Sequence, residues 1–204
     1  MLRSLPTLEE EQTLWSQGYR LVAGFDEVGR GSWAGPVVVG AVVFPQDCQI
    51  HPELKDSKQL SAKKRQQLLE WIKKVALAWA IAETGVDIIN KLGIGKATQI
   101  AFRKTFTKIQ PDYVLMDAFY IKHILRKYQK PIIKGDEKCA SIAAASILAK
   151  VYRDDLMVRL NKTFPQYGFD KHKGYGTRLH QDAIAKYGLS QVHRTSFNLQ
   201  KFLH

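Results

Sequence analysis

Hydrophobic residues in this chain fall into short runs that turn residues separate. The runs at 20–26 and 36–44 are almost continuously apolar, which predicts two buried strands that pair antiparallel. Residues 76–82 alternate small and large side chains with a period of two, which predicts a strand with its bulk on one face. Shorter apolar runs at 113–116 and 131–134 predict two further strands.

Helices are predicted where apolar positions recur every three or four residues: 7–17, 61–74, 87–109, 121–128, 140–161 and 177–187. Thr7 with Glu10 forms a capping-box pattern, and Ser61 can cap the second helix. Gly93 and Gly95 are expected to break the third. The order of the elements indicates an α/β fold, a mixed five-stranded sheet flanked by helices.

Composition narrows the kind of protein. With 204 residues, 45% of them hydrophobic, the chain suits one domain with a substantial core. It contains no apolar run of membrane-spanning length and no signal-peptide pattern at its start. Cys48 and Cys139 are the only cysteines and lie far apart in sequence, which predicts a reducing compartment, the cytoplasm. The net charge of +12 predicts a polyanionic partner, with nucleic acid favoured over a membrane surface.

An acidic pair, Asp26-Glu27, stands where the first apolar run meets a glycine-rich turn. Neighbours on a strand point to opposite faces, so both carboxylates can serve one site only if the strand bends or ends there, which Gly29 and Gly31 permit. A carboxylate near a core needs a cation, either a basic side chain or a metal ion. The alternative is a turn in which both acids pair with Arg30.

Two more acids follow predicted strands. Asp117 ends the run at 113–116, and the carboxyl ends of strands gather functional groups in α/β sheets. Asp136 follows the run at 131–134. The alternatives are a polar strand-terminating residue for Asp117 and a helix N-cap for Asp136. Four carboxylates in a basic protein suit two Mg²⁺ or Mn²⁺ ions, whereas zinc-ligand spacing is absent.

Five motifs in order resemble ribonuclease HII. They are Asp26-Glu27-Val28-Gly29-Arg30-Gly31, Asp56-Ser57-Lys58-Gln59-Leu60-Ser61, Lys134-Gly135-Asp136, the run from Ala143 to Lys150, and His172-Lys173-Gly174-Tyr175. The resemblance covers nearly the whole chain. It implies a ribonuclease H-like fold, a two-metal carboxylate site, and cleavage of RNA in RNA/DNA hybrids and at single ribonucleotides in duplex DNA.

The resemblance also implies roles for individual residues. Asp26, Glu27, Asp117 and Asp136 match the metal-binding catalytic positions. Gly29, Arg30 and Gly31 match the turn that reads the ribose 2′-hydroxyl, and Tyr175 matches the tyrosine that packs on the neighbouring sugar. Ser32-Trp33 and Ala118-Phe119 depart from the family pattern, which puts fine substrate preference in doubt. The related ribonuclease HIII carries an additional N-terminal domain, and the 25 residues before Asp26 argue against that class.

The physical properties of these residues agree with such roles and leave alternatives open. Glycines let backbone groups approach a 2′-hydroxyl closely, although Arg30 could instead form a structural salt bridge. Tyr175 between two glycines suggests an exposed turn, with core packing as the alternative. Lys58 belongs to a basic run that suits phosphate contact or a solvated face. Ser146 and Lys150 share a helix face and could also meet a phosphate.

Other assignments complete the prediction. Residues 20–165 are expected to form the catalytic core and 166–204 a small helical extension that contacts the substrate, in a monomer. The segment 197–203 is a candidate contact for a replication clamp. His172 and His193 are predicted to be polar surface or hydrogen-bonding residues rather than general bases. A non-catalytic hybrid-binding module would not need four acids, and a resolvase would not need the Gly-Arg-Gly turn.

Overall fold

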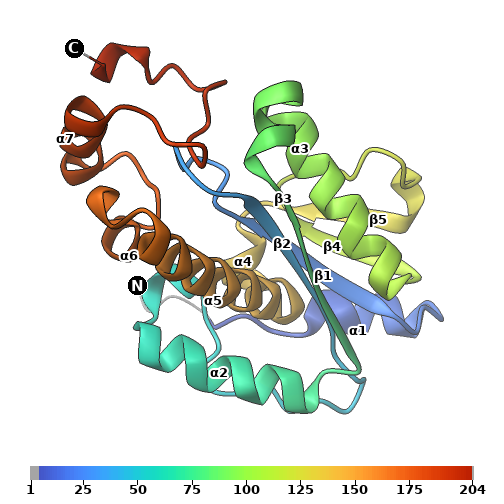
Figure 1. Ribbon diagram of the computed structural model, residues 1–204. Helices are drawn as coiled ribbons and strands as arrows, with labels where there is room; N and C mark the ends of the chain where they lie inside the picture. The colour runs from blue at the N-terminus through green and yellow to red at the C-terminus, as the bar shows by residue number, and fades with distance from the viewer. Residues whose placement is uncertain (1–4, 204) are drawn as a thin grey trace.

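The computed structural model describes residues 5–203, which form one mixed sheet with helices on both faces (Figure 1). The strands are β1 (Val22–Val28), β2 (Val37–Val43), β3 (Ala78–Thr84), β4 (Tyr113–Asp117) and β5 (Gln129–Ile132). They lie in the order β3-β2-β1-β4-β5. β2 is antiparallel to both β1 and β3, whereas β1, β4 and β5 are parallel. The predicted α/β fold is confirmed, with β1 at the centre of the sheet.

The helices form a layer on each face of this sheet. They are α1 (Glu9–Ser16), α2 (Ala62–Val75), α3 (Val86–Ile109), α4 (Gly135–Lys138), α5 (Ala140–Thr163), α6 (Phe169–His172) and α7 (Arg178–Tyr187). α3 covers one face and α5 the other, with α2 packed outside α5 (Figure 1). The predicted break in α3 is confirmed at Gly93, whose φ is +79°. Within residues 5–203, no helix is both long and apolar enough to cross a membrane.

Small residues allow α5 to lie unusually close to the sheet. A Cβ atom at Gly24 of β1 would collide with the backbone of Ser141, and one at Gly40 of β2 would collide with the carbonyl of Ala145. The inner face of α5 is rich in fully buried alanines. This close approach fixes the distance between α5 and the acidic end of β1, which matters for the candidate site.

Two predicted helices differ from the structure. The predicted helix 121–128 is wrong, because only the 3₁₀ turn Arg126–Tyr128 forms there. The Gln129 side chain holds the rest of the segment as a loop: it accepts from the Ile121 N–H and donates to the carbonyls of Ile121 and Ile124. The predicted capping box at Thr7 is also wrong. The helix begins at Glu9, because the Thr7 backbone pairs with residues beside α5 instead: its N–H donates to the Lys138 carbonyl at 2.9 Å.

Other predicted boundaries need small corrections. Ser61 caps α2 as expected, with its Oγ accepting from the Lys64 N–H. β3 begins two residues later than predicted, at Ala78, and β5 ends at Ile132, before Lys134 turns the chain with a φ of +57°.

The C-terminal residues wrap from the end of α5 back to α3. α6 and α7 lie beside the far end of α5 (Figure 1). The chain then returns to α3, where Asn90 donates to the His193 carbonyl at 3.3 Å and accepts from the Ser196 N–H at 3.2 Å. This return places residues 190–197 next to the loop between β1 and β2.

Candidate active site

β1 delivers two carboxylates at its end. Alternate residues of a strand point to the same face. Asp26 is therefore on the face of Gly24, which lies against α5, and Glu27 is on the face of Phe25, which packs on the α3 side. The strand ends one residue after Glu27, and Gly29 then has a φ of +89°. The Glu27 N–H donates to Asp26 Oδ1 at 2.8 Å. The charge of Glu27 raises the pKa of Asp26, so the two carboxylates interact across the end of the strand although they start from opposite faces.

The other two acids arrive next to this strand end. β4 is parallel to β1 and ends at Asp117, whose Oδ1 accepts from the Gly135 N–H at 2.9 Å. Asp136 is buried, with 5% exposed. The N-cap alternative for Asp136 is wrong, because the residue before the short helix α4 is Lys134 and makes no side-chain cap. Asp136 Oδ2 instead accepts from Lys58 Nζ at 3.2 Å.

Burial and repulsion between neighbouring charges make three of these carboxylates, those of Asp26, Glu27 and Asp136, difficult to ionise. Burial, and then the charge of Glu27, raise the pKa of Asp26 well above its ordinary value, and Asp136 and Asp117 add to the effect. Burial raises the pKa of Glu27 to about 7, against the opposing effect of Arg30 and with a contribution from Asp117. Burial also raises the pKa of Asp136, against the effect of Lys58. The charge of Asp117 contributes to the upward shift of all three, so the four carboxylates constitute one electrostatic site.

Lys58 is the basic side chain nearest to this site. Asp56 Oδ1 accepts from the Lys58 N–H at 3.0 Å, which shapes the loop, and Ser57 Oγ lies 2.9 Å from Ser146 Oγ on α5. Burial would lower the pKa of the Lys58 ammonium, but Asp136 and Asp56 outweigh it and the net shift is upward. The Lys58 side chain is 75% exposed, so its ammonium neutralises the acids while remaining accessible to a phosphate.

Ser146 and Lys150, the predicted phosphate contacts, have protein partners. Ser146 is 1% exposed and lowers the pKa of Asp26 by hydrogen bonding to its carboxylate. Lys150 Nζ lies 2.8 Å from Asp154 and 6.0 Å from the centre of the Tyr175 ring. Their contact with substrate stays a prediction.

The Gly-Arg-Gly turn lies directly over Glu27. Arg30 Nη1 is 3.8 Å from Glu27 Oε1, and the guanidinium stacks 4.6 Å from the Phe119 ring centre. The Arg30 side chain remains 41% exposed. A Cβ at Gly29 would collide with Arg153, whereas Gly31 is exposed with open space around its Cα. The salt-bridge alternative for Arg30 is therefore present, and it leaves the guanidinium accessible.

Two buried arginines that the sequence analysis missed hold this turn. Arg153 donates to the Ala34 carbonyl at 3.1 Å and to the Lys173 carbonyl at 3.0 Å, and Arg194 donates to the Arg30 carbonyl at 2.9 Å. Burial lowers the pKa of Arg194 to about 9. A signal was available for Arg153, which stands four residues from Ala149 and from Met157 on a buried apolar face of α5.

Trp33 joins the Arg30 turn to the loop that carries Tyr175. The Trp33 N–H donates to the Gly174 carbonyl at 2.8 Å, and the indole lies where a Cβ at Gly176 would be. Its ring centre is 4.8 Å from that of Phe202. Tyr175 is 37% exposed, so the core-packing alternative is wrong. The position that departs from the family pattern therefore connects the two candidate recognition loops.

A histidine cluster lies beneath Tyr175. His180 Nδ1 lies 3.1 Å from the Tyr175 carbonyl, its Nε2 lies 3.0 Å from His193 Nε2, and its ring stacks on His172 at 4.5 Å. The Ser190 N–H donates to His193 Nδ1, so His193 Nε2–H donates to His180. The predicted hydrogen-bonding role of His172 and His193 is confirmed, but both are buried rather than on the surface.

The donor chemistry of the site fits a hard divalent ion. All four candidate donors are carboxylates, the oxygen ligands that Mg²⁺ and Mn²⁺ prefer. Burial raises the pKa of three of them, so a bound divalent cation would stabilise their ionised forms. Among the described residues, no group of three His, Cys, Asp or Glu side chains is already arranged to hold an ion.

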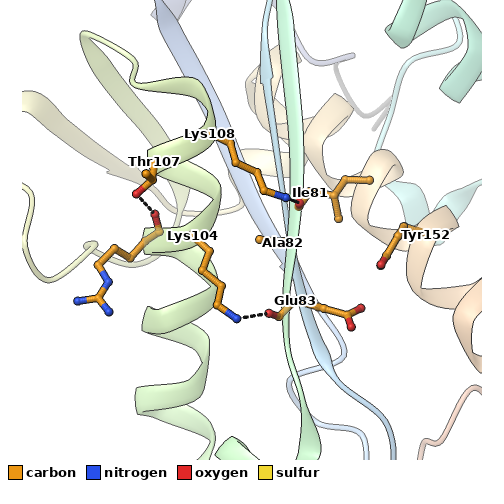
Figure 2. Close-up of a pocket in the computed structure, with 8 residues that line it drawn as sticks. Ile81, Ala82, Glu83, Lys104, Thr107, Lys108 and Tyr152 are labelled. Carbon is orange, nitrogen blue, oxygen red and sulfur yellow. Dashed lines mark hydrogen bonds between the residues drawn. The ribbon is translucent and has the colours of Figure 1, made fainter.

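A cavity of about 560 Å³ lies away from these acids, beside the exposed edge of β3 (Figure 2). Lys104 Nζ donates to the Glu83 carbonyl at 3.1 Å, and Lys108 Nζ donates to the Ile81 carbonyl at 2.6 Å. The two lysines thus bind backbone carbonyls at the free edge of β3, and lysines at a sheet edge commonly prevent pairing with a strand of another molecule. We assign this cavity a structural origin and no part in catalysis.

Known proteins resemble this chain over most of its length. The family model described as Ribonuclease HII matches residues 23–200. A ribonuclease HII from Alkaliphilus metalliredigens is 44% identical over 96% of this chain and 98% of its own length. One from Clostridioides difficile is 48% identical over 90% of this chain and 72% of its own length.

Solved structures agree with the fold. The ribonuclease HII of a PCNA complex from Archaeoglobus fulgidus has a TM-score of 0.70 at 25% identity, covering 88% of this chain and 97% of its own. A ribonuclease H2 from Pyrococcus horikoshii has a TM-score of 0.72 at 23% identity, covering 89% and 96%. With the sequence matches spanning the four acids and both glycine-flanked loops, the chain belongs to the ribonuclease HII family of endoribonucleases.

Proposed function

We propose that this endoribonuclease hydrolyses the RNA strand of RNA/DNA hybrids and cuts on the 5′ side of single ribonucleotides embedded in duplex DNA. The observation that carries the proposal is the junction of two candidate recognition loops beside one acidic cluster. The Trp33 N–H bond to the Gly174 carbonyl holds the Arg30 turn against the Tyr175 loop, and Arg30 itself lies 3.8 Å from Glu27. A ribose read at this junction would have its phosphate at the acids.

Recognition of one ribose fits the local backbone. Gly31 is exposed and has no Cβ, so backbone groups around it can approach a 2′-hydroxyl, the group that distinguishes RNA from DNA. Arg30 keeps an accessible guanidinium that can contact the adjacent phosphate. Tyr175 presents its ring on the second loop, where it can pack on the next sugar. A single ribonucleotide would satisfy both loops.

Asp26, Glu27, Asp117 and Asp136 would hold two Mg²⁺ or Mn²⁺ ions. When bound, such ions would polarise the phosphodiester and activate a water molecule for attack on phosphorus. The bond to the 3′ oxygen would break, which leaves 3′-hydroxyl and 5′-phosphate ends. The residues of the chain set the conditions for this chemistry. Ser146 orients Asp26, the Gly135 N–H orients Asp117, and Lys58 offsets the charge of Asp136 until substrate arrives.

The test is incubation with a DNA duplex that contains one ribonucleotide, with Mg²⁺, with Mn²⁺, with Ca²⁺ or with EDTA. We expect one cut 5′ of the ribonucleotide in Mg²⁺ or Mn²⁺ and none in Ca²⁺ or EDTA, because the looser shell of Ca²⁺ positions water poorly. An all-DNA duplex is the control. Ligation and phosphatase sensitivity identify the ends. A 2′,3′-cyclic phosphate would contradict the mechanism, and cleavage confined to long RNA runs would contradict recognition of a single ribose.

The wider assignments rest on less specific observations. Cys48 and Cys139 are both free thiols, which is consistent with the proposed cytoplasmic location. The proposed role in DNA repair follows from incision at embedded ribonucleotides. We propose a monomer in which residues 20–165 form the catalytic core and 166–204 an extension that carries Tyr175. Because the Archaeoglobus fulgidus relative was solved in complex with PCNA, segment 197–203 is proposed as a clamp contact. Gel filtration alone and with a clamp would test both.

A further inference from the structure

A basic groove runs from Arg30 along α3, on the side opposite to the Tyr175 loop. It encloses about 480 Å³ between α3 and the loop that follows β4. Arg30, Lys96, Arg103 and Lys122 contribute side chains to it, together with Gln99. Aspartate and glutamate are absent from the described residues that line it. The groove is therefore a concentrated positive surface that begins at the candidate ribose-reading turn.

Hydrogen bonds of Gln99 fix the shape of this groove. Gln99 Nε2 donates to the Tyr120 carbonyl at 3.0 Å, and its Oε1 accepts from the Lys122 N–H at 2.8 Å. At the other end of the same loop, the Phe119 ring packs against the Arg30 guanidinium at 4.6 Å. α3, the loop after β4 and the Arg30 turn are thus held together, so their cations face one space.

The cations of this groove differ from their neighbours on α3. Lys104 and Lys108 donate to backbone carbonyls of β3 and are already engaged. Lys96, Arg103 and Lys122 are exposed, and their side chains form no hydrogen bond or ion pair with any described residue. Unpaired cations at the wall of one groove, with no acid to neutralise them, are suited to bind an extended polyanion.

We propose that this groove binds phosphates of the duplex that flanks the ribonucleotide, which extends the nucleic-acid contact beyond the catalytic acids. This inference rests on the proposed function for the position of the ribose at Arg30. Lys96 and Arg103 are seven residues apart on the continuous part of α3, a rise of about 10 Å. That distance corresponds to about three nucleotides of one strand, at roughly 3.4 Å per step. The groove binds charge and does not read sequence.

The test compares Lys96→Gln/Arg103→Gln with a charge-matched control, Lys74→Gln/Lys162→Gln, whose exposed lysines lie outside the groove. Affinity is measured in EDTA on duplexes with one ribonucleotide, lengthened separately on the 5′ and 3′ sides. Because no cleavage occurs in EDTA, the result does not depend on the cleavage specificity of the enzyme.

We expect the wild type and the control to gain affinity as one side of the duplex lengthens, and the groove variant to lose most of this gain. The slope of log affinity against log salt should fall in magnitude by about 2 in the groove variant relative to the control, since two phosphate contacts are lost. A groove variant with the same length dependence and salt slope as the control on both sides would overturn the proposal.

Discussion

Asp117 Oδ1 accepts a hydrogen bond from the Gly135 N–H at 2.9 Å, so one acid of the site holds the turn that carries the next, Asp136. The carboxylate therefore has an architectural role in addition to the catalytic role proposed for it. An asparagine at position 117 retains an Oδ1 acceptor but loses the negative charge. The two roles can therefore be separated by substitution.

We predict that Asp117→Asn lowers the cleavage rate by more than about 100-fold, because charge stabilisation in the transition state is lost while the turn is kept. Duplex affinity should change little, since it depends mainly on Lys and Arg contacts with phosphates. Asp117→Ala, which also removes the acceptor, should cost about 1 kcal/mol more in unfolding free energy. Steady-state kinetics, a binding titration and urea unfolding measure the three effects. Near-normal turnover of Asp117→Asn would remove this residue from the catalytic set.

We also predict that Asp26→Asn stabilises the metal-free protein while inactivating it. Burial and three neighbouring acids raise the pKa of Asp26, so its ionised form opposes folding at neutral pH. Asparagine can still accept from the Glu27 N–H at Oδ1. The expected gain in unfolding free energy at pH 7 without divalent ions is about 1–2 kcal/mol.

The pH dependence supplies the control for this second prediction. A carboxyl whose folded pKa is raised loses its destabilising effect as pH falls and the group protonates. The advantage of Asp26→Asn should therefore shrink on acidification, and also when Mg²⁺ is added, because only the wild type gains from an added cation at that position. An advantage that is independent of both pH and Mg²⁺ would show that packing, not charge, is the cause.

The sheet and the acids could be predicted because each leaves a local signal. The apolar runs that end at Asp26-Glu27 and at Asp117 lie within single strands, and β1, β2 and β4 form where these runs stand. The helix predicted at 121–128 does not form, and the reason is physical. Its helical pattern is overruled by Gln129, which forms three hydrogen bonds with backbone groups of Ile121 and Ile124. A side chain that satisfies a loop in this way is not visible as periodicity.

The supports of the site were not predictable because they join distant parts of the chain. Arg194 is 164 residues from the Arg30 carbonyl that it binds, and Arg153 reaches the Ala34 carbonyl across 119 residues. Trp33 stood out only as a departure from the family pattern, although it connects both loops. Sequence patterns identified the candidate catalytic and recognition groups, whereas the positions of these groups depend on tertiary contacts.

The position of Trp33 leads to a third prediction, on substrate preference. Trp33→Ala removes the contact with Gly176 and Phe202, so the Arg30 turn and the Tyr175 loop should hold one ribonucleotide less accurately. We expect kcat/KM to fall further on a single embedded ribonucleotide than on a long hybrid, where several registers can bind. Stability should fall by about 2 kcal/mol, less than for a fully buried Trp.

Trp79→Ala is the matched control for Trp33→Ala, because Trp79 is 42% exposed on the edge strand β3, outside the site. It should leave the ratio of kcat/KM values on the two substrates unchanged. An equal loss by Trp33→Ala on both substrates would mean that the indole supports the fold without influencing selectivity.

The last prediction concerns acid stability and the histidines beneath Tyr175. Burial lowers the pKa of His180 and of His193 to about 4 each. The folded pKa of each ring lies below the unfolded value of about 6.5, so the fold favours the neutral ring, and this contribution to stability is complete above pH 6.5. As the pH falls from there toward the folded pKa, the contribution is lost by up to about 1.4 kcal/mol per pH unit for each ring. The raised pKa values of Asp26, Glu27 and Asp136 act in the opposite direction.

His193→Asn separates the two effects, because the Oδ1 of the asparagine can accept from the Ser190 N–H but does not titrate. We expect the melting temperature of the wild type to fall more steeply than that of His193→Asn between about pH 6.5 and pH 4.5. Parallel curves would assign the acid sensitivity to other groups.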